Sequence, residues 1–193
     1  MARIPYIDPA TATPELRDAL ERLPAGLNVF KMLANAETLF PSWARLGGAI
    51  LGRMKLSPKL RELIILRVAR LSNCDYEWTQ HVPIGRNCGI DDAQIAALAE
   101  NRADAPCFDE TERIVLRATD ESVEGVRLPE ATFEELARRF DRREIVEILM
   151  TAGFYRALAM VLESTAVDSD PPAGAEVVGE IVRRLERFPS GGA

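Results

Sequence analysis

The sequence predicts an all-α protein of roughly eight to nine helices, arranged as one core with helical arms. Apolar residues recur at three- and four-residue spacing along most of the chain, and the strict alternation typical of strands is missing. Residues that commonly start helices precede most of these periodic segments. The composition, 193 residues with 47% hydrophobic and 28% charged, is that of an ordinary globular protein.

The N-terminal residues 1–39 are expected to form a helical arm. Thr13 and Pro14 mark the start of one helix, in which leucines share a single face. Residues 25–33 and 37–54 each favour a short helix, because proline and a pair of glycines interrupt their apolar runs. We therefore expect the arm to lead into the core near residue 40.

The predicted core, residues 40–165, carries the strongest helix signals. One helix begins with Ser57 as its N-cap and Pro58 in its first turn, and its apolar stripe is wide enough for a mostly buried helix. The helix that follows, over residues 73–89, contains Pro83. This proline removes one backbone hydrogen bond and is expected to bend the helix axis.

Two further helices are predicted from capping boxes. In such a box an N-cap side chain and a Glu or Gln side chain three positions later satisfy each other's backbone N–H groups. Asp91 with Gln94 fits this pattern, and so does Asp109 with Glu112. Both pairs precede apolar helical segments, so each should fix the start of a helix.

The last part of the chain favours three more helices. Residues 128–140 and 141–165 are both periodic, and the second segment is apolar enough to form a central helix. Residues 166–193 are expected to form a linker, rich in proline and aspartate, and a final amphipathic helix.

The overall charge excludes some classes of partner. The net charge is −6 and the isoelectric point is about 5.0, with Lys and Arg dispersed among acidic residues. This distribution argues against a nucleic-acid partner.

The N-terminal segment lacks the apolar stretch of a signal peptide, and no membrane span is visible, so we expect a cytoplasmic protein with no membrane partner. Three cysteines without a secretion signal indicate reduced thiols.

One helical segment concentrates reactive side chains. Cys74, Glu77 and His81, the only histidine, are spaced three and four positions apart, so they project from one side of the helix. A carboxylate bound to one imidazole nitrogen leaves the other nitrogen free for acid/base chemistry. The alternative is structural: a lone helical histidine is commonly a packed or surface residue, and a free cysteine commonly behaves as a small apolar side chain.

Glu62 is a second unusual carboxylate. It lies on the apolar helix before this segment, with no Lys or Arg three or four positions later. A carboxylate on such an apolar helix face either pairs with a side chain from another part of the protein or has a functional role. Arg67 and Arg70, on the same helix, could supply that partner or bind an anionic substrate. Ordinary salt bridges are the alternative role for both arginines.

Other chemistries lack their sequence signals. One histidine and scattered carboxylates do not show the dense spacing of zinc or iron ligands. The sequence also lacks a glycine-rich phosphate loop, a nucleophile elbow and a dinucleotide fingerprint. We therefore expect no metal and no cofactor.

The segment "RELIILRVARLSNCDYEWTQHVPIGRNCGIDDAQIAAL" resembles the core of the carboxymuconolactone decarboxylase and alkylhydroperoxidase D (AhpD-like) superfamily. Within it, "YEWTQHVPIG" is similar to the decarboxylase branch, and the resemblance covers roughly residues 40–165. Peroxidase members carry a glutamate, a CxxC pair and a histidine; here Glu62, Cys74 and His81 match, but Glu77 stands at the second cysteine. Without that thiol, peroxide reduction through an intramolecular disulfide is not expected.

The resemblance implies an AhpD-like helical bundle that forms a homo-oligomer, a dimer, trimer or hexamer. It also implies a cofactor-free, lyase-type enzyme acting on a small carboxylated lactone or related ring compound in aromatic compound catabolism. His81 would be the acid/base group, Glu77 would orient it, and Glu62 would assist. Tyr76 and Trp78 could line the substrate pocket. The alternatives are a peroxide-linked enzyme that uses Cys74 alone and a non-catalytic oligomeric protein that binds a ligand.

Overall fold

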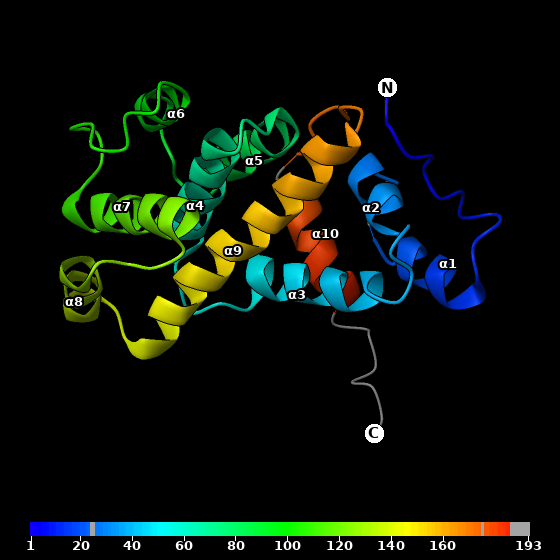
Figure 1. Ribbon diagram of the computed structural model, residues 1–193, viewed down its shortest axis with the longest axis horizontal. Helices are drawn as coiled ribbons and strands as arrows, with labels where there is room; N and C mark the ends of the chain where they lie inside the picture. Colours follow the sequence, from blue (N-terminus) through cyan, green and yellow to red (C-terminus); the bar gives the residue numbers. More distant parts are fainter. Residues whose placement is uncertain (24–25, 175, 186–193) are drawn as a thin grey trace. The chain divides into compact units, whose positions relative to one another are not determined.

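A computed structural model describes residues 1–23, 26–174 and 176–185 of the chain (Figure 1). These residues form ten α-helices and no strand, which confirms the all-α prediction and adds a helix to the expected count. The helices group into a terminal unit, residues 1–53 with 161–193, and a central unit, residues 54–160. Residues 40–53, expected in the core, thus group with the N-terminal arm.

The terminal unit has an apolar core built from short amphipathic helices. The Thr13 side chain accepts the backbone N–H of Leu16 and caps the first helix, as predicted. Apolar residues from both ends of the chain then share one buried cluster that includes Leu16, Phe40 and Ile181. The helices of this unit are α1 (Pro14–Glu21), α2 (Asn28–Leu33), α3 (Phe40–Gly52) and α10 (Glu176–Leu185).

Side-chain hydrogen bonds hold the segment that was expected to be a linker. The Tyr6 hydroxyl donates to Asp168 Oδ2 at 2.9 Å and accepts the backbone N–H of Asp168 at 2.8 Å. Asp170 Oδ2 accepts the backbone N–H of Asn28 at 2.7 Å. The amphipathic helix α10 follows, and its predicted continuation to residue 188 lies outside the described residues.

The central unit is organised around α4, which packs against α5, α6 and α7 (Figure 1). Ser57 accepts the backbone N–H of Leu60, and Pro58 occupies the first turn, as the sequence predicted. Nine consecutive residues of this helix, 61–69, are buried, so protein surrounds this part of the helix on every side. The helices of this unit are α4 (Pro58–Leu71), α5 (Asp75–Asn87), α6 (Asp92–Ala99), α7 (Glu110–Gly125), α8 (Glu130–Arg139) and most of α9 (Arg142–Thr165).

A tight turn joins α4 to α5. Asn73 adopts a left-handed backbone conformation with φ of 49°. The backbone N–H of Cys74 donates to the carbonyl of Ala69, and the N–H of Asn73 donates to the carbonyl of Arg70. This is the hydrogen-bond pattern of a Schellman motif, which satisfies the last carbonyls of a helix. The turn starts α5 directly beside the end of α4.

Gly85 allows α5 to lie close to α4. A Cβ atom at this position would lie 3.2 Å from Leu66 Cδ1 and 3.1 Å from Ile90 Cδ1, both tighter than an ordinary contact. Gly85 follows His81 by one helical turn, and the same hypothetical Cβ would be 3.8 Å from Glu62 Cβ. Because Gly85 has no side chain, α5 can lie close to the part of α4 that carries Glu62. Pro83 lies inside α5, as predicted.

The two predicted capping boxes are confirmed. Asp91 and Gln94 exchange hydrogen bonds at the start of α6, and Asp109 and Glu112 do so at the start of α7. Glu112 is buried and also accepts Gln94 Nε2 at 2.7 Å and contacts Lys59 Nζ at 2.6 Å. One carboxylate thus ties the ends of three helices together.

The long helix α9 has a buried and an exposed face. By length and composition it is the one described helix that could span a membrane, and half of its most apolar window is buried inside the protein. Such burial is typical of the core helix of a soluble fold. Tyr155 belongs to the buried face, whereas Val146, Met150 and Met160 are exposed.

Candidate active site

His81 and Glu62 form a buried hydrogen bond between α5 and α4. His81 Nδ1 lies 2.8 Å from Glu62 Oε2, and the relative exposures of the two residues are 8% and 0%. Because an ionised carboxylate can only accept, Nδ1 carries the proton and Nε2 faces away from Glu62. This bond fixes the orientation of the imidazole ring.

Arg61 occupies the second oxygen of the same carboxylate. Its Nε donates to Glu62 Oε1 at 2.8 Å, and the arginine is itself buried. Burial raises the pKa of Glu62, but the charges and hydrogen bonds of His81 and Arg61 outweigh burial and leave that pKa below its usual value. Glu62 is therefore an ionised carboxylate between two donors.

Glu77 faces the other side of the imidazole. Its Oε2 lies 3.7 Å from His81 Nε2, which is too long for a direct hydrogen bond. Glu77 is 4% exposed, and within the described part of the chain its carboxyl group makes no hydrogen bond. Burial raises the pKa of Glu77 from 4.5 to about 7, because the attraction of His81 compensates only partly and Glu62 adds repulsion.

The two carboxyl groups favour the protonated form of His81. Burial by itself lowers the pKa of His81, but the charge and hydrogen bond of Glu62, with a further contribution from Glu77, raise it overall. Glu62 thus has the orienting role that the sequence analysis assigned to Glu77. The physical reason is distance, since Glu62 reaches Nδ1 at 2.8 Å and Glu77 approaches Nε2 only to 3.7 Å.

Cys74 lies at the N-cap of α5 and is 1% exposed. All three cysteines are free thiols. Cys88, at the other end of α5, has its sulfur 3.8 Å from the Arg61 guanidinium, and burial raises the pKa of the Cys88 thiol. The two ends of α5 therefore carry separate thiols, with the acid/base groups between them.

The predicted substrate-binding arginines contact other residues, and neither is the partner of Glu62. Arg67 binds both carboxylate oxygens of Asp120, at 2.5 and 2.9 Å, which places its guanidinium toward α7. Arg70 lies 3.7 Å from Asp75 and stacks over Trp78 at 5.3 Å from the ring centroid. Trp78 also packs against the apolar cluster between α4 and α7.

Tyr76 is the remaining predicted pocket residue. It is buried near the start of α5, one position before Glu77. Successive residues on a helix point about 100° apart, so Tyr76 and Glu77 belong to neighbouring faces. Of the eight predicted site residues, the structure brings Glu62, Glu77 and His81 into direct proximity.

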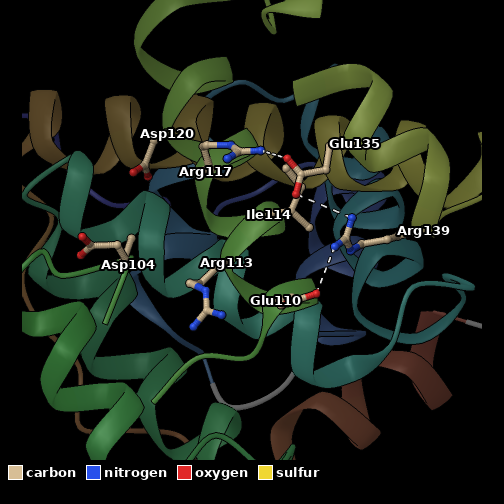
Figure 2. Close-up of a pocket in the computed structure, with 9 residues that line it drawn as sticks. Asp104, Glu110, Arg113, Ile114, Arg117, Asp120, Glu135 and Arg139 are labelled. Carbon is tan, nitrogen blue, oxygen red and sulfur yellow. Dashed lines mark hydrogen bonds and ion pairs between the residues drawn. The ribbon is translucent and has the colours of Figure 1, made fainter. Parts of the chain in front are cut away.

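A separate hollow of about 470 Å³ lies between α7, α8 and the loop before α7 (Figure 2). Its charged walls are mostly paired: Arg117 with Glu135, and Arg139 with both Glu110 and Glu135. The hollow is thus bordered by an ion-pair network that joins α7 to α8. Asp120 also lines the hollow and forms a separate ion pair with Arg67 of α4.

Two residues of the site were missed by sequence reasoning. Arg61 precedes Glu62 directly, and helix rules do not pair adjacent residues, so it carried no signal. Tyr155 comes from α9 and meets the His81 ring edge-on, with centroids 5.1 Å apart. Its separation from His81 in sequence left no local pattern to detect. In the part of the chain that the structure describes, no group of three His, Cys, Asp or Glu side chains is placed to bind a metal ion.

Comparison with known proteins finds a family similarity for the segment that carries this arrangement. Residues 37–121, less than half of the chain, match the carboxymuconolactone decarboxylase family. The matched segment runs from before α3 into α7 and contains Glu62, Glu77 and His81. A sequence comparison with curated proteins finds no match.

Solved structures share the fold over nearly the whole chain. The AhpD core of a peroxidase-related protein from Ralstonia eutropha aligns with a TM-score of 0.75 and 19% identity, over 94% of this chain and 96% of that one. A peroxidase-related protein from a Silicibacter species aligns at 0.70 and 24%, over 91% and 95%. The debrominase Bmp8, solved with 2,3,4-tribromopyrrole, aligns at 0.67 and 15%, over 95% and 96%. At 15 to 24% identity, these structures show that the chain shares their fold.

Proposed function

We propose that the protein is a cofactor-free acid/base enzyme that decarboxylates a small carboxylated lactone or related ring compound. The observation that carries this proposal is the pair formed by His81 Nε2 and the Glu77 carboxyl, buried 3.7 Å apart. A carboxyl group with a pKa of about 7 is well matched to proton transfer near neutral pH. The two atoms are close enough that one polar atom bound beside them could hydrogen-bond to both.

The proposed reaction exchanges a carboxylate for a proton. The bond between the ring carbon and the substrate carboxylate breaks, and carbon dioxide leaves. The electron pair of that bond stays on the ring as an enolate conjugated with the lactone carbonyl. His81 then gives its Nε2 proton to the ring carbon, Glu77 returns a proton to Nε2, and solvent restores Glu77. Each turnover thus consumes one proton and needs no oxidant or reductant.

The remaining charged groups support this proton transfer. Glu62 holds the Nδ1 proton, so His81 can only donate and accept through Nε2. Arg61 keeps Glu62 ionised, which favours the charged imidazole that acts as the acid. The positive charge of His81 also suits a carboxylate substrate and the enolate that follows it.

The thiol alternative has less support. Cys74 is 1% exposed, and the position of a second, resolving thiol is taken by Glu77. A single-cysteine enzyme would need Cys74 to meet peroxide and form a sulfenic acid. Labelling of Cys74 by a thiol reagent, before and after hydrogen peroxide, tests this alternative directly.

Carbon dioxide release tests the proposed function. Carboxymuconolactone and related carboxylated lactones would be incubated with the wild-type protein and with His81→Ala. We expect release from at least one lactone by the wild type, and a loss of about 10³-fold or more in the variant, as for removal of a proton-transfer group. Full turnover by His81→Ala would reject the site. No release by the wild type, together with peroxide-sensitive labelling of Cys74, would favour the thiol enzyme.

We also propose that the protein acts as a homo-oligomer in the cytoplasm. The resemblance to the superfamily supports the first point. On the chain itself, Val146, Met150 and Met160 form an exposed apolar face along α9, and such faces commonly mark association surfaces. The expected biological setting, catabolism of aromatic compounds, follows from the proposed substrate class.

A further inference from the structure

The Tyr155 side chain is buried at the site, but its hydroxyl has no protein partner. The residue is 3% exposed, and its ring meets the His81 imidazole at 90° with centroids 5.1 Å apart. Within the described residues the hydroxyl makes no hydrogen bond. Buried tyrosines normally satisfy this group. The hydroxyl oxygen is not among the fully buried atoms that lack a hydrogen-bond partner, so this end of the side chain retains some contact with solvent. A phenylalanine would provide the same packing without this donor.

The charges around Tyr155 determine what its hydroxyl can do. Burial raises the pKa of Tyr155 well above 10, and the carboxylates of Glu77 and Glu62 raise it further, while Arg61 opposes them weakly. The hydroxyl is therefore protonated near neutral pH. It cannot serve as a base, and it remains available as a neutral donor.

We propose that the Tyr155 hydroxyl donates a hydrogen bond to the anionic oxygen of the bound substrate. The inference rests on the proposed function and adds Tyr155 to the groups that contact the substrate. His81 would deliver the proton to carbon, while Tyr155 would hold the lactone oxygen on which negative charge develops. A donor that is already in place in a dry site stabilises such charge strongly.

Binding of tetronate tests the inference. Tetronic acid is a five-membered lactone that ionises to a stable conjugated enolate, so it resembles the proposed intermediate. Calorimetric titration would compare the wild type, Tyr155→Phe and the matched variant Tyr6→Phe. Tyr6 lies in the terminal unit, where its hydroxyl binds Asp168.

We expect the wild type and Tyr6→Phe to bind tetronate equally, and Tyr155→Phe to bind it about 10- to 100-fold more weakly, the range for a hydrogen bond to a charged group. Equal affinity of Tyr155→Phe and wild type would overturn the inference. So would a failure of the wild type to bind tetronate.

A second measurement serves if Tyr155→Phe does not fold. The chain has three tyrosines, so wild-type protein labelled with 3-fluorotyrosine gives three fluorine resonances. Saturating tetronate should shift the Tyr155 resonance and leave that of Tyr6 in place. An unmoved Tyr155 resonance in the presence of bound tetronate would contradict the inference.

The inference and the proposed function can fail separately. Tyr155-dependent binding of tetronate without carbon dioxide release from any lactone would reject decarboxylation and support the inference. Carbon dioxide release that is unchanged in Tyr155→Phe would support decarboxylation and reject the inference.

Discussion

Glu62 and His81, nineteen positions apart in the sequence, meet at 2.8 Å in the interior of the central unit. This contact makes one nitrogen of the imidazole a fixed donor and leaves the other nitrogen to face Glu77. The chemistry proposed for the site depends on that asymmetry. The substitutions proposed below each change one residue, and a measurement of stability, binding or assembly follows the effect.

Replacement of Glu62 should destabilise the protein. Glu62→Gln removes the charge that compensates Arg61 and His81, and breaking a buried charge pair typically costs about 3 to 5 kcal/mol of unfolding free energy. Urea unfolding at neutral pH measures this loss. The same substitution at exposed Glu134 of α8 is the control and should change stability by less than about 0.5 kcal/mol. Equal effects of the two substitutions would contradict an ionised, paired Glu62.

The raised pKa of Glu77 predicts a specific dependence of stability on pH. Its pKa is about 7 in the folded protein and 4.5 as the ordinary value. The folded state binds this proton more tightly, so the contribution is fully present below pH 4.5 and is lost as the pH rises through 7. The total loss is about 3 kcal/mol.

Glu77→Gln isolates that contribution. The wild type should lose stability between pH 5 and pH 8, and the variant should show a smaller loss over the same interval, as measured by urea unfolding. Because the Glu77 carboxylate also raises the pKa of His81, the difference between the two profiles reports the coupled titration of Glu77 and His81. Parallel pH profiles of the two proteins would show that Glu77 does not titrate in this range.

A methyl group at position 85 should disturb the contact between α4 and α5. Gly85→Ala places a Cβ atom within 3.1 to 3.2 Å of two side chains, so α5 must shift or the neighbours must move. We expect a loss of about 1 to 3 kcal/mol and a changed His81 resonance. Gly153→Ala of α9 is the matched control, since nothing lies within 4 Å of its added Cβ.

The control variant Gly153→Ala should have the opposite effect on stability. Alanine is favoured over glycine in a helix by about 0.5 to 1 kcal/mol, so Gly153→Ala should stabilise the protein and leave His81 unchanged. Stabilisation by both substitutions would show that Gly85 is not needed for close packing.

Glu112 should matter for stability and not for proton transfer. Glu112→Ala removes an acceptor for Gln94 and the partner of Lys59, and it leaves buried donors without partners. We expect a loss of about 2 kcal/mol by urea unfolding, with tetronate affinity unchanged. Glu110→Ala, at an exposed position two residues earlier, should cost less than half as much. A Glu112→Ala variant as stable as the wild type would contradict its role as a tie between helices.

The exposed apolar face of α9 predicts how the oligomer can be broken. Met150→Glu places a charge in the middle of that face, and a desolvated, unpaired charge opposes association. Light scattering after size-exclusion chromatography should show a smaller particle than the wild type. Val126→Glu, at a more exposed apolar position after α7, should leave the mass unchanged. A wild type that elutes as a monomer would reject the oligomer itself.

Local features of the fold could be predicted from the sequence because they depend on neighbouring residues. Ser57 and the two capping boxes were located from residue type and spacing alone, and each forms the expected hydrogen bonds. The all-α class followed from the same periodicity. The division of the chain into units did not follow, since it depends on packing between distant helices such as α3 and α10.

Local sequence patterns did not predict the contacts between helices that form the candidate site. The four-residue spacing pointed to Glu77 as the partner of His81, but a carboxylate on another helix lies closer. That approach depends on the left-handed turn at Asn73 and on the absence of a side chain at Gly85. Neither the contact of Tyr155 with His81 nor the pairing of Arg67 with a residue of α7 leaves a local pattern.

The proposed chemistry requires that Glu62 favours the protonated form of His81 and keeps a proton on Nδ1 when the ring is neutral. The chain has a single histidine, so the imidazole nitrogen resonances of the ¹⁵N-labelled wild type can be followed through a pH titration without ambiguity. We predict an imidazole pKa above the ordinary value of 6.5, with Nδ1 still protonated on the high-pH side of the transition. A pKa below 6.5, or a neutral ring with the proton on Nε2, would contradict the account.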